Sequence, residues 1–158
     1  MVAVAVAVAL VSLGVALAAL LLEDPGAARA DRARESALAA ARERTTALTS
    51  YDHRSLDEDF AAVLETATGS FEAEYRRTTE QLRATFLQQR AMAQAQVVAV
   101  GLESAHVDGD GPDRAVAVVA VDQVIRVAGA APRTERNRLR MELVRRDGTW
   151  LVERVERL

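Results

Sequence analysis

The chain has 158 residues, of which half are hydrophobic and 27% are charged, so it has room for one globular domain and a membrane anchor. It contains no cysteine, which excludes disulfides, thiolate nucleophiles and cysteine-ligated zinc or iron–sulfur sites. The net charge is −3 and no basic stretch is interleaved with aromatic residues, which argues against nucleic-acid binding.

The first segment, Val2 to Leu22, carries no charged residue. As a helix it would be roughly 31 Å long, which matches the hydrocarbon thickness of a bilayer. A secretory signal peptide is the alternative, because Ala28-Arg29-Ala30 has the form of a cleavage site, but the apolar run is longer than signal peptides use. We therefore predict a single-pass transmembrane anchor over residues 1–22. The Arg residues that follow it favour a cytoplasmic position for the next domain.

Residues 23–50 are predicted to form a connecting helix. After a break at Pro25 and Gly26, the segment is dense in residues that favour helices. Four residues of this helix recur at helical spacing, and the face they form is expected to pack on the domain that follows. Its members are Leu38, Ala41, Thr45 and Leu48.

Two more helices are expected after a corner at Tyr51. Ser55 and Glu58 have the spacing of a capping box, which would open the first helix. Gly69 ends that helix and Ser70 caps the next one. Aromatic residues on the apolar faces predict a structural corner where the connecting helix turns into the domain. The corner residues are Tyr51, Phe60, Phe71, Tyr75 and Trp150.

The second half of the chain changes to the alternating pattern of strands. A Gly- and Asp-rich turn precedes Pro112, and Asp147-Gly148 has the form of a two-residue hairpin. The four predicted strands are 95–107, 114–127, 138–145 and 149–155. Helices followed by an antiparallel meander predict an α+β fold, in which residues 51–158 form a cone of helices on a curved four-stranded sheet.

The acidic run from Asp57 to Asp59, near His53, suggests a metal site or an acid–base pair. Successive side chains on a helix point about 100° apart, so the three carboxylates cannot converge on one site. Acidic residues in a first turn are also expected from the helix dipole. His106 is isolated and gives no second ligand. We therefore predict no metal-binding residue and no cofactor.

The corner residues Tyr51, Asp52 and His53 could form an acid–base site if burial shifted their pKa values. The sheet supplies no partner for such a site, because its inward positions are apolar. Asp122, the one acid inside the long strand, is out of phase with those positions. We predict packing and capping roles for these residues, and no catalytic residue.

Basic residues accumulate near the C-terminus, with nine Arg against five acids from Arg126 to Arg157. Arg136, Arg138 and Arg140 share one face of a predicted strand. This face could bind anionic lipid head groups or an acidic partner surface. A solvated sheet face without a ligand is the alternative.

Three segments carry a resemblance to a known family. They are Ser50-Tyr51-Asp52, the corner Thr68-Gly69-Ser70-Phe71 with Tyr75, and Asp147-Gly148-Thr149-Trp150-Leu151-Val152. Together with the apolar N-terminus and the Ala/Arg helix, they make the chain resemble the Mce-associated membrane proteins. The resemblance implies a cone domain similar to nuclear transport factor two and to periplasmic domains of type IV secretion scaffolds. It also implies an accessory role beside mammalian-cell-entry (Mce) lipid importers, with the cone outside the cytoplasmic membrane.

The resulting hypothesis is a single-pass protein of the cytoplasmic membrane with an extracytoplasmic cone domain. It would be a non-enzymatic accessory or stabilising subunit of a lipid or sterol import complex, with transporter or other envelope subunits as partners and with room for homo-oligomers. One alternative is a small-molecule binder or enzyme that uses an interior pocket near Tyr51 and His53. A second alternative is an assembly scaffold of another envelope machine, such as a secretion channel.

Overall fold

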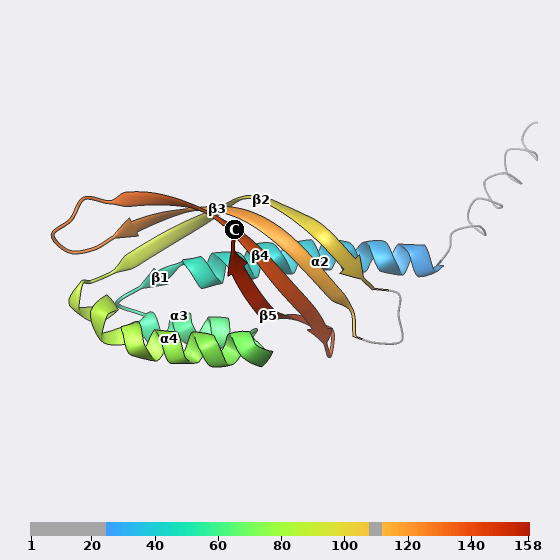
Figure 1. Ribbon diagram of the computed structural model, residues 1–158, viewed down its shortest axis with the longest axis horizontal. Coiled ribbons are helices and arrows are strands. Elements are labelled where there is room, and N and C mark those ends of the chain that lie inside the picture. Colours follow the sequence, from blue (N-terminus) through green and yellow to red (C-terminus); the bar gives the residue numbers. More distant parts are fainter. Residues whose placement is uncertain (1–24, 108–111) are drawn as a thin grey trace, which may run out of the picture. The chain divides into compact units, whose positions relative to one another are not determined.

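The computed structural model describes residues 25–107 and 112–158 (Figure 1). The predicted anchor at residues 1–22 and most of the turn before Pro112 lie outside the described residues. No helix in the described part of the chain combines the length and the hydrophobicity needed to cross a membrane. The chain divides into two compact units, Met1–Arg32 and Ala33–Leu158, and the second unit holds the sheet.

The described helices are α2 (Pro25–Thr49), α3 (Leu56–Leu64) and α4 (Gly69–Gln88). From Ala33 onward, the buried face of α2 is a stripe of small side chains at every fourth position, each at most 2% exposed. The stripe consists of Ala33, Ala37, Ala41 and Thr45. The sequence prediction included Ala41 and Thr45 but also Leu38 and Leu48, which are only half-buried. These small side chains are buried, as the dense packing of a protein interior requires.

The sheet has five antiparallel strands in the order β1-β2-β3-β4-β5, so the predicted four-stranded sheet is wrong by one strand. The missed strand is β1, which has only two residues and cannot show alternation. Strand β4 also begins five residues earlier than predicted, in a stretch that is polar on both faces. The strands are Tyr51–Asp52, Met92–His106, Arg114–Arg126, Arg133–Arg146 and Thr149–Arg157. The predicted α+β class and the antiparallel pairing are confirmed.

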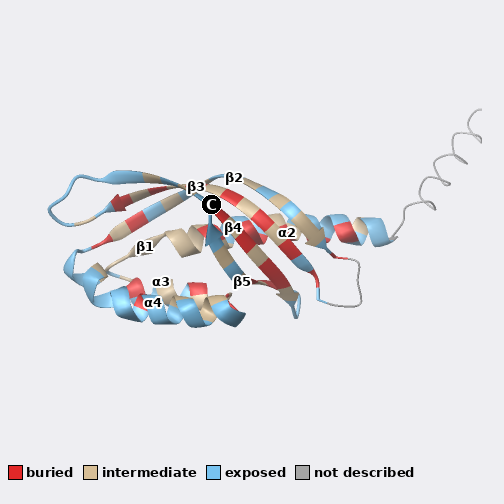
Figure 2. Ribbon diagram, in the orientation of Figure 1, coloured by how far each residue is buried: buried red, intermediate tan, exposed pale blue. Residues whose placement is uncertain are grey.

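The core lies on the concave face of this sheet. Along β3, every second residue from Ala115 to Val121 is at most 1% exposed, and Met141 and Leu143 continue the buried face on β4. Figure 2 shows these buried positions along β3 and β4. The apolar inward positions expected of the sheet are therefore found on β4 as well, because alternate side chains of a strand point to opposite faces.

Side-chain hydrogen bonds join α2 to three strands. The Arg42 guanidinium donates to the Val97 carbonyl of β2 at 3.3 Å, and the Gln123 amide of β3 donates to the Thr49 carbonyl at 2.8 Å. The Trp150 indole of β5 donates to the Ser36 hydroxyl at 2.9 Å. Helix α2 thus occupies the concave side of the sheet through contacts with β2, β3 and β5.

The contact between Trp150 and Ser36 is the most buried of the three. Trp150 is 4% exposed, so its indole N–H cannot be satisfied by solvent. The Ser36 hydroxyl accepts that bond and donates its own hydrogen bond to the Ala33 carbonyl at 2.9 Å. The Arg145 guanidinium lies 5.9 Å from the centre of the Trp150 ring on the same hairpin.

The hairpin between β4 and β5 follows the sequence prediction. Asp147 and Gly148 have φ angles of +50° and +82°, as a two-residue turn of the mirror-image type requires. The free edge of β5 is covered at one point, where the Thr68 amide donates to the Val152 carbonyl and the Val152 amide donates to the Thr66 carbonyl, both at 2.8 Å. This exchange fixes the corner between α3 and α4 against the sheet.

The predicted caps are confirmed only in position for α3. Ser55 is the residue before α3, as predicted, but its side chain makes no capping bond. The predicted cap Ser70 of α4 is wrong, because α4 begins at Gly69 with Thr68 before it and has no side-chain cap. The Asp59 carboxylate instead reaches back to the Asp52 amide at 2.7 Å. This bond closes the β1–α3 loop, so the acid that matters locally is Asp59 and not Glu58.

We expect Ser36→Ala to lower the free energy of unfolding by about 1–3 kcal/mol, because it leaves the Trp150 N–H buried without a partner. In a Trp150→Phe background the same change is expected to cost less than about 0.5 kcal/mol, since no N–H remains. Chemical denaturation of the four proteins measures both values. Thr46→Ala is the matched control on the same helix, because that hydroxyl bonds only to the Arg42 carbonyl. Equal costs of Ser36→Ala in both backgrounds would show that the bond does not tie α2 to β5.

Candidate functional site

The predicted structural corner is a chain of half-buried aromatic rings. Ring centres lie 4.8 to 6.1 Å apart along the series Phe71, Tyr75, Phe60, Phe86 and Tyr51. These contacts hold α3, α4 and β1 together, since each of the three contributes at least one ring. Phe86 was not among the predicted corner residues, and Trp150 lies elsewhere, on β5 against α2.

Both tyrosines of the chain lie in this cluster, and their phenols are perturbed. Burial raises the pKa of Tyr75 to about 12, with a smaller contribution from the Asp59 carboxylate. Burial also raises the pKa of Tyr51, with opposing contributions from Arg133 and Glu135. A raised pKa keeps both phenols neutral near pH 7, which suits packing and hydrogen bonding better than base catalysis.

The Asp52 carboxylate pairs with the Arg54 guanidinium and lies beside the His53 ring. Hydrogen bonds from the side chain and then the backbone of Arg54 hold the pKa of Asp52 at about 2. The His53 Nδ1 lies 3.3 Å from an Asp52 oxygen and has no hydrogen-bond partner among the described residues. The lining of the cleft beside His53 does not include Tyr51.

The acids of the first turn of α3 are dispersed. Asp57 pairs with Arg83 of α4, Asp59 binds back to the Asp52 amide, and Glu58 is exposed. A shallow cleft of about 270 Å³ lies beside them, lined by both charged and apolar side chains. Its lining includes His53, Asp57, Glu58, Arg83 and Leu87. Within the described part of the chain, no group of three or more His, Asp or Glu residues has the arrangement of a metal site.

The predicted arginine face lies on the outer, convex side of β4, where its three members differ. Arg140 donates to Glu103 of β2 at 2.9 Å and to Glu142 at 2.8 Å. Pairing with Glu103, and then with Glu142, raises the pKa of Arg140. Arg140 is thus committed to a contact that crosses β3 and joins β2 to β4. This pairing gives it a structural role in the sheet.

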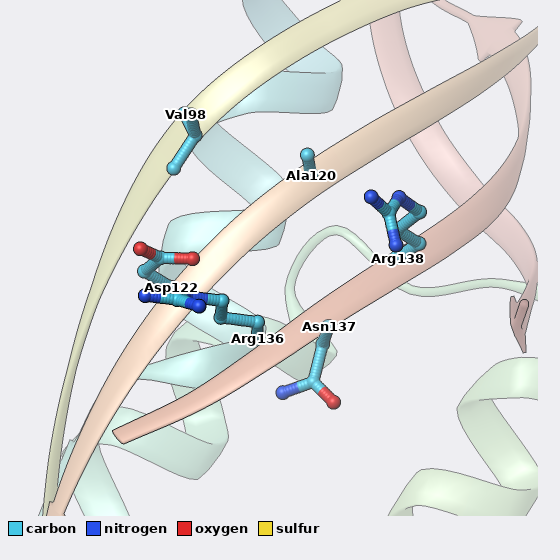
Figure 3. A pocket seen from close by; sticks show the side chains of 6 residues that line it. All are labelled: Val98, Ala120, Asp122, Arg136, Asn137 and Arg138. Atoms are coloured by element: carbon cyan, nitrogen blue, oxygen red, sulfur yellow. The ribbon is translucent and has the colours of Figure 1, made fainter.

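Arg136 and Arg138 are exposed and have no ion pair within the described part of the chain. They line a cleft of about 290 Å³ on the convex face, shown in Figure 3. Val98 and Ala120 form the apolar part of this cleft, and Asp122 stands beside Arg136 on the neighbouring strand. The cleft therefore combines a small apolar floor with two free cations and one carboxylate.

Sequence reasoning found the arginines but missed the rest of this cleft. Val98 is 61% exposed because it lies at a β-bulge, where β2 has one residue more than β3. A bulge inside an all-apolar run leaves no sequence signal. The available signal was the run from Ala115 to Val121, which is apolar on both faces of β3.

The comparisons with known proteins decide the family. The family model described as "Uncharacterized protein Rv1363c/MT1408-like" matches residues 1–158. The chain belongs to this family.

Two relatives come from Mycobacterium tuberculosis. The uncharacterized protein Rv1362c is 34% identical over 131 residues, which cover 82% of this chain and 54% of the relative. The outer membrane protein Rv1973 is 32% identical over 140 residues, which cover 88% and 85% of the two chains. The chain thus spans about half the length of Rv1362c and most of the length of Rv1973.

Solved structures show the same fold at low sequence identity. The periplasmic domain of DotI has a TM-score of 0.67 at 11% identity and covers 78% of this chain and 94% of its own. An IcmL-like type IV secretion system protein from Legionella pneumophila has a TM-score of 0.64 at 11% identity, with coverages of 79% and 91%. VirB8 of Agrobacterium tumefaciens has a TM-score of 0.58 at 11% identity, with coverages of 76% and 88%. The expected cone fold is thereby confirmed.

We expect the phenol of Tyr75 to ionise about two pH units above the ordinary tyrosine value. In Tyr51→Phe it is the only tyrosine left, so ultraviolet absorbance during an alkaline titration reports it alone. The buried neutral phenol of Tyr75 contributes to stability. Because its folded-state pKa is raised, this contribution is present below about pH 10 and is lost as the pH rises towards 12. A single ionisation near pH 10 in the folded protein would contradict the burial of Tyr75 in the aromatic cluster.

Proposed function

We propose that the chain is a non-enzymatic scaffold subunit of a protein assembly in a bacterial cell envelope. The observation that carries the proposal is the division of the sheet into two faces. The concave face is apolar and filled by α2, whereas the convex face carries a cleft with unpaired charged side chains. In a fold of this kind, the convex face of the sheet is available to bind a partner protein.

The names of similar proteins support an envelope location. Rv1973 is an outer membrane protein, and the DotI structure is that of a periplasmic domain. The IcmL-like structure is that of a type IV secretion system protein. These names favour the hypothesis of a scaffold for a secretion-type envelope machine over the other hypotheses from the sequence.

The second candidate is an accessory subunit of an Mce-type lipid importer. It rests on the resemblance of the N-terminus, the α3–α4 corner and the β4–β5 hairpin to Mce-associated membrane proteins. Both candidates require a protein that binds other envelope subunits and catalyses no reaction. They differ only in the identity of those subunits.

Capture of the full chain from the envelope of its own organism tests the proposal. The chain carries an affinity tag, proteins are cross-linked in living cells, and co-purified proteins are quantified by mass spectrometry. The matched control joins residues 1–50 to an unrelated extracytoplasmic domain. We expect several subunits of one envelope assembly to be enriched over the control.

The identity of the captured subunits separates the two candidates. Secretion-channel subunits support the first, and Mce importer subunits support the second. Equal capture by the chain and by the control would contradict the scaffold function, because residues 51–158 would then bind no partner.

A further inference from the structure

The outer face of β3 is apolar where a solvated sheet face would be polar. Between its end residues Arg114 and Arg126, the outward residues Val116, Val118, Ala120 and Val124 are half-buried, and Asp122 is the one charged residue among them. Strands with apolar residues on both faces are typical of sheets that are covered on both sides. Within the described part of the chain, α2 covers only the concave side. The convex stripe therefore has the composition of a surface that is covered in an assembly.

Charged groups beside this stripe indicate what covers it. Arg136 and Arg138 are two residues apart on one strand face, so their attachment points lie about 7 Å apart. Figure 3 shows them on the same side of β4, together with Asp122 of β3. Guanidinium groups bind carboxylates by paired hydrogen bonds, and neither Arg is paired within the described residues. The complementary ligand carries carboxylates next to small apolar side chains.

The shape of the site favours a protein segment over a membrane surface. The sheet is curved, and this face is its convex side, so a flat bilayer would touch it only along a narrow line (Figure 1). The carboxylate of Asp122 can accept a hydrogen bond from a peptide N–H of such a segment. A cleft of about 290 Å³ is at the lower limit for small-molecule sites and fits one or two side chains of a peptide.

We propose that the cleft formed by Val98, Ala120, Asp122, Arg136 and Arg138 docks an acidic-aliphatic segment of a partner protein. The carboxylates of the segment bind Arg136 and Arg138, and an aliphatic side chain rests on Val98 and Ala120. Arg140 does not take part, because Glu103 and Glu142 already neutralise it. The inference rests on the scaffold function proposed above and names the chemistry of its partner.

Selection from a random-peptide phage library tests this docking site. The target is the full chain purified in mild detergent, and the strongest peptide is then synthesised and titrated by fluorescence polarisation. We expect enriched peptides to carry Asp or Glu beside Val, Leu, Ile or Ala. Binding is expected to weaken at least about tenfold in R136E/R138E and in V98D. It is expected to stay within about twofold in R146E/R157E, which makes the same charge change at exposed residues outside the cleft.

Several results would overturn the docking site. One is enrichment of peptides without acidic residues, and another is equal loss of binding in R136E/R138E and R146E/R157E. A third is tight binding of the full chain to phosphatidylglycerol vesicles that R136E/R138E abolishes, which would assign the face to lipid. All the changed side chains lie at the surface, so each variant is expected to fold. Circular dichroism checks this.

The docking site and the scaffold function can fail separately. If R136E/R138E still captures the same envelope subunits and no acidic peptide is selected, the docking site is wrong and the scaffold function stands. If acidic peptides bind in an arginine-dependent way but capture from the envelope finds no assembly, the cleft is correct and the scaffold function is wrong.

Discussion

The close packing of α2 inside the curved sheet is the constraint on which the rest of the structure depends. A stripe of Ala and Thr side chains on this helix is buried, and the hydrogen bond from Trp150 to Ser36 ties the helix to β5. Because the chain itself fills this side, we propose that partners bind the outer side of the sheet. The aromatic cluster then closes the other end, where α3 and α4 meet β1.

Charged side chains have two different roles on the convex face. Arg140 is neutralised by acids on β2 and β4, and this pairing stiffens the middle of the sheet. Arg138 lies opposite Ala120, and Arg136 lies opposite Asp122 but forms no ion pair with it among the described residues; β2 bulges beside them at Val98. The bulge at Val98 lies in the same cleft as the side chains of Arg136 and Arg138.

The sequence predicts much of this fold because its signals are local. Alternation in β4 identifies Leu139 and Met141 as buried, and Asp147-Gly148 identifies the hairpin. The two-residue strand β1 could not be predicted, since its pairing with Met92 and Ala93 depends on contacts far along the chain. The capping bond of Ser55 is absent for a local reason, because the Ser55 hydroxyl donates to the Asp59 carboxylate instead. The cleft was found only in part, because a bulge is set by the pairing of two strands.

Cysteine accessibility tests the central claim, that the concave face is filled by the chain and the convex face binds partners. The native chain has no cysteine, so a single one can be placed at Ala117, which is fully buried, or at Ala120, which lines the cleft. In the purified full chain, we expect a maleimide to label Ala120→Cys but to label Ala117→Cys only after denaturation. In native envelopes, labelling of Ala120→Cys is expected to fall sharply. Ready labelling of Ala117→Cys in the folded protein, or unchanged labelling of Ala120→Cys in the envelope, would contradict the account.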